Sequence, residues 1–512
     1  MGDPLGSETM PPPPIPTTTT VCLMPRHSPA APPLSPPRRP LAPGWIVLVA
    51  ILAFAHGSAA ALDLSLPELG DPAARVLSSQ EEARIGQQMM REIRREVALV
   101  DDPAINAYVR DLGTRIATAT DMPGAAYRFF VVDDPRINAF AMPGGYVGVH
   151  SGLITASRNE SELGAVIAHE LAHVTQRHIA RRVAATQGVN LRTTALVLAG
   201  LLIGSQNPQA GMAAATSGMA SGIDSQLAYS RDHEREADRV GMRILARADL
   251  NPQGMPDFFQ VLMDDSRYRS QPPAFLSTHP LTEARIADAR AIARSIAPSE
   301  IFESPDHAFI RARARVLAAE NPDEAVEAFA ARVQSQPDRG NRYGLAYARI
   351  RAGDVDRARR LLDTLASEQP EHALLVLARA EAAMADNAPE AALAELNRGL
   401  SLFPDHPALT LTRVEVHLQS GRPDKALAIT RTLSHQQPNA PEVWSLHARA
   451  ASAAGDDDES ALAMAQYYAV QGDTQAGLSQ LKRLDPATAT PNQVARARAL
   501  RERWESRIAP DG

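Results

Sequence analysis

Residues 162–173 read Glu-Leu-Gly-Ala-Val-Ile-Ala-His-Glu-Leu-Ala-His, and this stretch decides which fold the chain can adopt. Two glutamates and two histidines stand among residues that are otherwise small or apolar. Such residues predict a helix over residues 160–180, and because apolar residues surround the polar ones, the helix should be buried. A buried cluster of ionisable groups needs a partner to remain there. The stretch therefore predicts a domain built around a polar site.

The two histidines have the spacing of metal ligands. His169 and His173 are four residues apart, which places them on one helix face with Cβ atoms about 5–6 Å apart. Zinc accepts such nitrogen ligands, and a catalytic zinc site keeps one position open. Glu170 is rotated by about 100° from His169, so it can reach that position without binding the metal, as a general base must. A pair of solvent-facing histidines is the alternative, which the apolar surroundings disfavour.

A second polar segment, residues 229–238, supplies a third ligand. Glu234 and Asp238 share a helix face by the same four-residue rule, and we assign Glu234 to the zinc. Asp238 fits a different role, in which it accepts an N–H from a ligand histidine and fixes its ring. Glu236 points elsewhere and is expected at the surface or in a salt bridge. His233 remains a competing ligand, and a charged solvated helix remains the alternative for the whole segment.

Further helices and strands are expected on both sides of the motif helix. Apolar periodicity and capping residues predict helices over residues 78–97, 103–117 and 230–248. Strand-forming residues occupy 128–132, and two extended pieces within 138–149 flank a Pro-Gly-Gly turn at 143–145. The strand near residues 144–149 is expected to pair with an extended substrate. The predicted domain is thus mainly helical with a small sheet.

Beyond about residue 305 the chain repeats itself every 34 residues. Gly353, Asn387, Gly421 and Gly455 keep this step, and so does a column of small residues, Ala358, Ala392 and Ala426. A period of 34 residues is the tetratricopeptide length, in which each unit is a pair of helices. Small residues let the paired helices approach closely, and Gly or Asn turns the chain between them. The register slips after Gly455, as expected of a terminal repeat.

The N-terminal segment predicts export. An apolar run over residues 45–55 follows two arginines and precedes a small-residue stretch, which is typical of a secretory signal peptide; an uncleaved anchor is the alternative. The single cysteine, Cys22, lies upstream of this signal, so neither disulfides nor cysteine-ligated metal are expected. The net charge is -7 and no basic run occurs, which excludes nucleic acid as an expected partner. A Gly/Ala/Ser/Met-rich stretch at 193–223 is either a mobile loop beside the site or a buried helix.

These residues together resemble the M48 family of zinc peptidases, and more narrowly its bacterial periplasmic group, the beta-barrel assembly-enhancing proteases. The resemblance covers about residues 78–485. It is carried by residues 138–141 and 144–145, the His-Glu-Leu-Ala-His motif, Ser230-Arg231 with Glu234 and Asp238, and Ser277-Thr278-His279-Pro280 with Arg285 and Ile286. It implies a mainly α fold, in which a zincin-type metallopeptidase domain with a small β-sheet precedes an α-solenoid of tetratricopeptide-like repeats.

The expected domain boundaries follow from both lines of reasoning. A disordered extension takes residues 1–44, a signal peptide 45–61, and the metallopeptidase domain 62–300. Repeats fill 305–485, and a C-terminal tail takes 486–512. Because every motif residue precedes about residue 290, the peptidase is expected to be complete without the repeats.

By resemblance, the chain is expected to be a zinc endopeptidase of the bacterial periplasm, with one zinc per chain bound by His169, His173 and Glu234. Glu170, Asp238 and His279 are the expected catalytic residues. His279 is open to three interpretations: it is structural, it stabilises the oxyanion, or it occupies the open zinc position and holds the enzyme off. Arg285 is expected to pair with Asp238 or Glu234. His150 and His178 lie near the site in the sequence and are both expected to have structural roles.

The same resemblance implies quality control and assembly of outer-membrane proteins, with chaperone-like activity. Misfolded or stalled outer-membrane proteins are the expected substrates, and the repeats are expected to hold the outer-membrane assembly machinery. Peripheral membrane contact stays open. The alternative from another class is a repeat-scaffold chaperone whose protease site is silent or latent.

Overall fold

The computed structural model describes residues 77–185, 230–268, 273–296, 301–368, 372–485 and 487–508. The predicted extension, signal peptide and Gly/Ala/Ser/Met-rich stretch therefore lie outside the described residues. All described residues belong to one compact unit.

Two capped helices open the described chain. Helix α2 (Ser79–Glu96) begins with a capping box, in which the Ser78 side chain accepts from the Glu81 N–H and Glu81 accepts from Ser78 in return. Helix α3 (Pro103–Thr118) begins after Asp102, whose side chain accepts two backbone N–H groups. Both helices lie where the sequence predicts them.

A three-stranded sheet follows, built from β1 (Arg128–Val132), β2 (Ala139–Met142) and β3 (Tyr146–His150) in the order β1-β3-β2. The turn between β2 and β3 uses Gly144 and Gly145, both at positive φ near 80°, which glycine adopts readily. Strand β3 pairs in parallel with β1 and antiparallel with β2. Since both sides of β3 are occupied, the prediction that this strand binds substrate is wrong.

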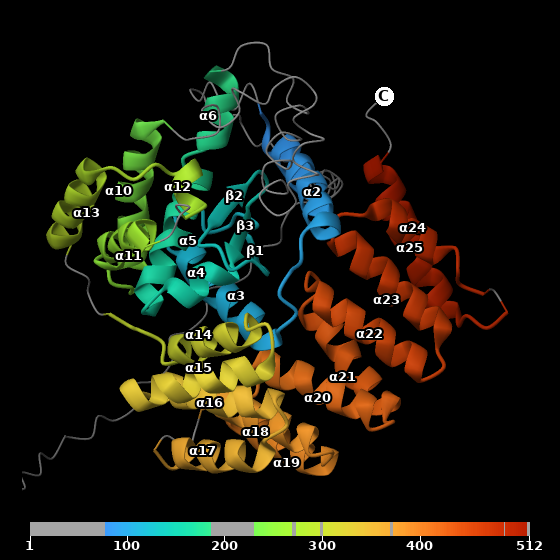
Figure 1. The fold of residues 1–512 in the computed structure, drawn as a ribbon. Coiled ribbons are helices and arrows are strands. Elements are labelled where there is room, and N and C mark those ends of the chain that lie inside the picture. The colour runs from blue at the N-terminus through green and yellow to red at the C-terminus, as the bar shows by residue number, and fades with distance from the viewer. Residues whose placement is uncertain are drawn as a thin grey trace, which may run out of the picture. The chain divides into compact units, whose positions relative to one another are not determined.

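The helices of the domain before residue 300 surround one buried helix (Figure 1). Every residue of α5 (Glu160–Thr175) from Glu160 to His173 is buried, and α5 packs against α10 (Arg231–Arg247), α11 (Gly254–Tyr268) and β2. The remaining helices of this domain are α4 (Ser151–Ala156), α6 (His178–Ala185), α12 (Phe275–Thr278) and α13 (Glu283–Ser295). The sequence predicts one helix over 160–180, but Arg177 adopts a left-handed φ of 51° and breaks it.

From residue 306 onward the chain forms consecutive helix pairs, coloured yellow to red in Figure 1. The four predicted turn residues Gly353, Asn387, Gly421 and Gly455 all have positive φ, and the three column alanines are fully buried. This confirms the repeat prediction. The helices are α14 (Asp306–Leu317), α15 (Pro322–Ser335), α16 (Arg339–Arg351), α17 (Val355–Glu368), α18 (Ala373–Ala385), α19 (Pro389–Leu402), α20 (Pro407–Gln419), α21 (Pro423–Gln436), α22 (Pro441–Ala453), α23 (Asp457–Val470), α24 (Thr474–Leu481) and α25 (Pro491–Ile508).

The last of these helices lies in the segment predicted to be a tail. Helix α25 buries Trp504 and Leu500 in a cluster with Leu481 of α24 and Leu462 of α23. It thereby covers the apolar face that the final repeat would otherwise leave exposed, which is the role of a capping element in a solenoid.

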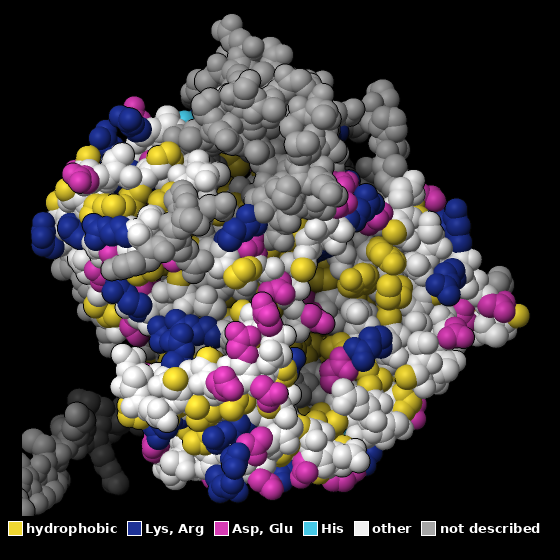
Figure 2. All heavy atoms as spheres, viewed as in Figure 1, with side chains coloured by type: hydrophobic (Ala, Val, Ile, Leu, Met, Phe, Trp, Pro, Cys, Tyr) yellow, Lys and Arg dark blue, Asp and Glu magenta, His cyan; other side chains and the backbone are white. Residues whose placement is uncertain are grey.

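The repeats and the domain that precedes them share one hydrophobic core. A single cluster of buried residues runs from Ala104 in α3 to Val416 in α20, and it includes Phe309 and Ile310 of α14. Helices α14 and α20 both pack on α3. Of the helices in the described ranges, none combines the length and apolar character needed to cross a bilayer. On the face shown in Figure 2, the described Lys and Arg side chains are interspersed with Asp and Glu and form no continuous basic stripe.

Candidate metal centre

Helix α5 places the two motif histidines side by side in the protein interior. His169 and His173 are almost fully buried, and their Nε2 atoms lie 3.0 Å apart. Both rings thus point at the same spot, as the four-residue spacing predicts.

Helix α10 brings the third residue of the site. Ser230 caps this helix by accepting from the His233 N–H, so Glu234 lies in its first turn. Gly241 lets α10 approach α5 closely, because a Cβ at this position would lie only 3.2 Å from the His169 backbone nitrogen. Oε2 of Glu234 lies 3.5 Å from Nε2 of His169, and Oε1 lies 3.4 Å from Nε2 of His173.

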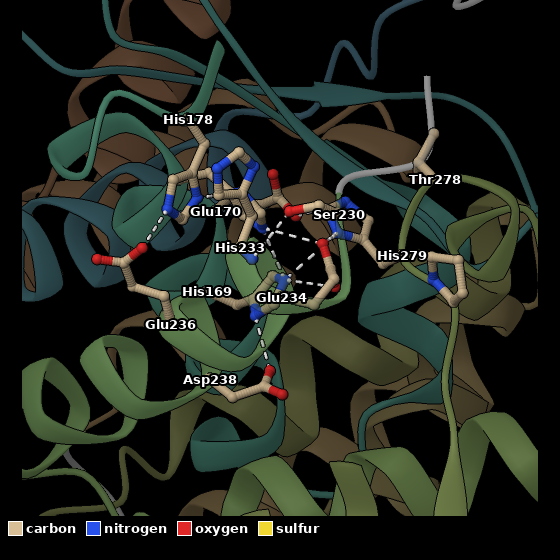
Figure 3. A network of polar contacts seen from close by, with 12 residues as sticks. His169, Glu170, His178, Ser230, His233, Glu234, Glu236, Asp238, Thr278 and His279 are labelled. Atoms are coloured by element: carbon tan, nitrogen blue, oxygen red, sulfur yellow. Dashed lines mark hydrogen bonds and ion pairs between the residues drawn. The ribbon is translucent and has the colours of Figure 1, made fainter. Parts of the chain in front are cut away.

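A fourth residue, His279, joins from the loop after α12. Its Nδ1 lies 3.0 Å from Glu234 Oε1 and 3.3 Å from His169 Nε2, and its ring stacks on Phe275 with centroids 4.4 Å apart. One potential ligand atom from each of His169, His173, Glu234 and His279 falls within 4.8 Å of the others. Figure 3 labels His169, Glu234 and His279 of this group, together with Glu170 and Asp238 beside them. His233, the competing candidate, is outside that group and stacks on His178 instead.

The charges in this cluster favour a cation at its centre. Burial would lower the pKa of His169, but the facing carboxylates of Asp238 and Glu234 outweigh it and raise that pKa to about 9. Burial holds the pKa of His173 well below its usual value. Burial would raise the pKa of Glu234, yet the three surrounding histidines hold it well below its usual range. A charged His169 can therefore donate to the lone pair of a neutral His173.

The same residues fit a metal ion. Two imidazole Nε2 atoms only 3.0 Å apart need a hydrogen or a cation between them, and a divalent metal can take the place of the hydrogen. Nitrogen and carboxylate ligands suit zinc and related transition metals. Metal sites also need a partner that fixes each ligand histidine, and Asp238 is such a partner. Its Oδ1 lies 3.1 Å from His169 Nδ1, so that Nε2 of this ring faces the ligand group.

Arg285 on α13 balances the acidic side of the site. Its guanidinium donates to both carboxylate oxygens of Asp238 at 2.8 and 2.9 Å, and Nη1 lies 2.7 Å from Glu234 Oε2. Arg285 thus pairs with both of the partners that the sequence suggested.

Glu170 lies beside the cluster, where a general base would be needed. The residue is 1% exposed, and His279 Nε2 is 3.3 Å from its Oε1. Burial raises the pKa of Glu170, while the nearby His279 and His169 lower it; the net shift is upward. A carboxyl group with a raised pKa gives up and takes back a proton more readily near neutral pH.

The sequence does not predict that His178 and Glu236 support the ligand residue His173. His178 begins α6 and is fully buried, with its Nδ1 2.9 Å from Nδ1 of His173 and its Nε2 3.2 Å from Glu236 Oε2. Sequence reasoning assigned His178 to structure and Glu236 to the surface or a salt bridge. Burial lowers the pKa of His178 to about 4, so its ring is neutral at neutral pH. His150, also assigned to structure, pairs with Asp134 instead, away from the ligand group.

Comparison with known proteins identifies the family of the domain that contains this site. Residues 103–293 match the family model "Peptidase family M48", and residues 343–407 and 383–450 match models of the tetratricopeptide repeat. The chain is 32% identical over 451 residues to the beta-barrel assembly-enhancing protease of Escherichia coli, which covers 87% of this chain and 90% of that protein.

Two further relatives extend the comparison. The putative beta-barrel assembly-enhancing protease of Vibrio cholerae is 38% identical over 60% of this chain and 65% of its own length. The mitochondrial metalloendopeptidase OMA1 of Schizosaccharomyces pombe is 29% identical over 40% of this chain and 59% of its own length. The chain therefore belongs to peptidase family M48, and it is a metalloprotease with C-terminal tetratricopeptide repeats.

Proposed function

We propose that this metalloprotease is a zinc-dependent endopeptidase of the bacterial periplasm that acts in the quality control and assembly of outer-membrane proteins. The observation that carries the proposal is the convergence of two imidazoles and one carboxylate within 4.8 Å in a buried core, with Glu170 beside them. The printed names of the bacterial relatives support the proposed substrate class.

His169, His173 and Glu234 would hold one zinc ion per chain. When bound, zinc polarises a peptide carbonyl and makes a water molecule more acidic. Asp238 keeps the Nδ1 hydrogen of His169 occupied, so that Nε2 is the atom left for the metal. Arg285 fixes the carboxylates of Glu234 and Asp238 in their places.

Glu170 would move the proton during hydrolysis. Its carboxylate accepts a proton from the attacking water and then gives it to the amine nitrogen of the cleaved peptide bond. The raised pKa of Glu170 suits both transfers, since a general base works best with a pKa near the working pH. The residue comes from α5 itself, so its distance from the two histidines is set by the helix.

Strand β2 would bind the substrate backbone. It forms one edge of the described sheet and packs against α5. An extended segment added to an edge strand is held by main-chain hydrogen bonds, which give affinity with little sequence preference. This suits a protease that removes misfolded or stalled proteins of many sequences.

His279 lies inside the ligand group, which supports the role in which it occupies the open metal position rather than a purely structural one. The repeats would hold a protein partner, in line with the outer-membrane assembly machinery that the relatives' names suggest. A silent scaffold with chaperone-like activity is the second candidate, and the helix pairs of the repeats support it independently of the site.

The Glu170→Gln variant tests the proposal. Glutamine keeps the shape of the side chain but cannot accept the proton, so cleavage of an unfolded protein substrate should fall by roughly 10²–10⁴-fold while zinc content stays at one per chain. Peptidase activity near the wild-type rate would contradict the role of Glu170. Zinc-loaded wild-type protein without peptidase activity would favour the silent scaffold, and envelope proteins trapped by the variant would identify the substrates.

A further inference from the structure

We propose that His178 and Glu236 are positioning residues for the metal site, and that they hold His173 in the ring orientation and tautomer that present its Nε2 to the metal. The inference rests on the proposed function, because it takes His173 as a ligand. It concerns two residues outside the ligand group, on α6 and α10.

Three side chains form a continuous row of polar contacts. Nδ1 of His173 lies 2.9 Å from Nδ1 of His178, and Nε2 of His178 lies 3.2 Å from Oε2 of Glu236. Figure 3 shows the last of these contacts, the one between His178 and Glu236. His173 and His178 are both fully buried, so neither ring can turn to water to satisfy its nitrogens.

The hydrogens of this row can be placed in one order that satisfies both of the contacts described above. An ionised carboxylate only accepts, so Nε2 of His178 must carry the hydrogen that it donates to Glu236. A neutral imidazole has one N–H, which leaves Nδ1 of His178 with a lone pair. That lone pair accepts the hydrogen on Nδ1 of His173, and the lone pair of His173 is then on Nε2, the atom that faces the ligand group.

Asp238 provides an internal comparison. It faces Nδ1 of His169 directly at 3.1 Å and gives that ring the same tautomer. Glu236 and Asp238 lie on one helix, so α10 serves both ligand histidines, one by direct contact and one through His178. Carboxylates behind ligand histidines are a general feature of metal sites, where they fix the ring and increase its basicity.

The break between α5 and α6 makes the contact possible. On a continuous helix, residues five apart are rotated by about 140°, so His178 would point away from His173. The left-handed conformation of Arg177 turns the chain and returns His178 to the site. Two neighbours then fix the row: His233 stacks on the His178 ring with centroids 4.4 Å apart, and Arg181 Nη1 lies 3.1 Å from Glu236 Oε2.

The test is the zinc affinity of the purified full-length protein, measured by competition with a chromogenic chelator. Removal of such outer partners typically weakens metal binding about 10–100-fold. We expect a loss of about 10-fold in Glu236→Ala and of 10–100-fold in His178→Phe. Glu236→Gln keeps an oxygen that can accept from His178 and should lie between wild type and Glu236→Ala.

Glu415→Ala is the matched control, since the Glu415 side chain is 32% exposed against 31% for Glu236 and also pairs with an arginine. It should bind zinc like wild type. Visible absorption of the cobalt-substituted protein gives a second readout, because a shifted ring changes the ligand field. The band should change in Glu236→Ala and stay unchanged in Glu415→Ala.

The outcomes separate the inference from the proposed function. If wild type binds no zinc, or if His173→Ala leaves its affinity unchanged, the proposed metal site fails. If His173→Ala abolishes binding but Glu236→Ala and His178→Phe bind zinc within about twofold of wild type, the metal site stands and the positioning role is overturned. Should His178→Phe fail to fold, the partly exposed Glu236 still decides the question.

Discussion

Arg285 is a buried arginine that faces two buried carboxylates. Its guanidinium is only 3% exposed and contacts Glu234 and Asp238, while its Nη1 also donates to the Pro280 carbonyl oxygen. Favourable contacts with both carboxylates raise the pKa of Arg285 although burial opposes this. The fork shape of a guanidinium matches Asp238, since both Nε and Nη2 donate to it. Charge balance in the site therefore depends on this residue as well as on the metal.

Removal of Arg285 should destabilise the metal-free protein. Breaking a buried ion pair by removal of one partner costs about 3–5 kcal/mol, because it leaves an uncompensated buried charge. We expect Arg285→Ala to show this loss in urea unfolding, and Arg285→Lys to recover part of it, since lysine keeps the charge but not the paired hydrogen bonds. Arg398→Ala, which breaks an exposed pair with Glu395, is the control and should unfold close to wild type. Equal losses of unfolding free energy in both alanine variants would contradict the proposed role of Arg285.

How far sequence predicts single site residues depends on whether one helix sets their spacing. His169, Glu170 and His173 were assigned from α5 alone, and Glu234 with Asp238 from α10 alone, because the four-residue rule applies within a helix. His279 comes from a loop and was suggested only by family resemblance. The contact of His178 with His173 depends on the left-handed conformation of Arg177. Because this position is an arginine and not a glycine, the sequence does not indicate a left-handed residue there.

At the scale of elements, the four described turns that keep the 34-residue step each contain a left-handed residue. Gly353, Gly421 and Gly455 supply it with glycine, but the same position in one repeat is Asn387 at a φ of 52°. Asparagine tolerates this conformation better than most residues, though less well than glycine. The column thus holds a natural comparison of the two residues in equivalent turns.

Opposite effects are expected from two substitutions in this column. Gly421→Ala should destabilise the repeats by about 1–2 kcal/mol, the cost of a left-handed residue with a Cβ. No atom lies within 4 Å of the added Cβ, so the loss comes from the backbone and not from a clash. Asn387→Gly should stabilise by a fraction of that amount. Urea midpoints measure both, and a Gly421→Ala midpoint equal to wild type would mean that the turn can relax to another conformation.

Element ends and strand order were harder to predict than element types. The strands were expected from their composition, but the order β1-β3-β2 depends on which strands pair, and local sequence does not encode this. The expected substrate strand therefore lies in the middle of the sheet, and β2 takes its place at the edge. The end of α5 was placed five residues too late because no glycine or proline marks Arg177.

At the scale of the whole molecule, buried polar contacts join the repeats to the peptidase. Arg313 of α14 donates to Asp102, the cap of α3, and to Glu381 of α18. His307 of α14 accepts from the Tyr108 hydroxyl at Nδ1 and donates from Nε2 to the Ser157 carbonyl oxygen. These contacts use both ring nitrogens of a neutral His307 and link α14 to two separate parts of the peptidase.

His307 should make the junction sensitive to acid. Burial lowers its pKa to about 4 from a usual value of 6.5. Below pH 6.5 the unfolded chain binds a proton at His307 that the folded chain does not bind. The free energy of unfolding therefore keeps its full value above pH 6.5 and declines as the pH falls toward 4. At pH 5 the loss amounts to about 2 kcal/mol, from roughly 1.4 kcal/mol per pKa unit.

The check is the change in unfolding free energy between pH 7 and pH 5. His307→Gln does not titrate, so its change should be smaller than that of wild type by about 1–2 kcal/mol. Because both proteins keep the same metal-site histidines, the difference between them isolates His307. Identical pH dependence of wild type and His307→Gln would mean that His307 in the folded protein binds the proton without loss of stability.

The position of a tolerated truncation follows from the shared core. The sequence predicts that a peptidase cut near residue 300 is complete, since the motif residues precede it. The packing favours a different result, because this cut removes Phe309 and Ile310 from the core and leaves Asp102 and Tyr108 without Arg313 and His307. Buried polar groups that lose their partners cost about 1–3 kcal/mol each, in addition to the exposed apolar surface. A cut after residue 437 keeps α14 and α20 on α3. It opens the interface between α21 and α22 and removes the contacts of Arg110 with Glu442 and of Arg91 with the Gly472 carbonyl oxygen, which are only part-buried. We expect the longer protein to stay soluble and to bind one zinc, and the shorter one to aggregate or bind less zinc. Size-exclusion chromatography with metal analysis measures both, and a soluble, zinc-loaded fragment ending at residue 300 would show that the peptidase folds without the repeats.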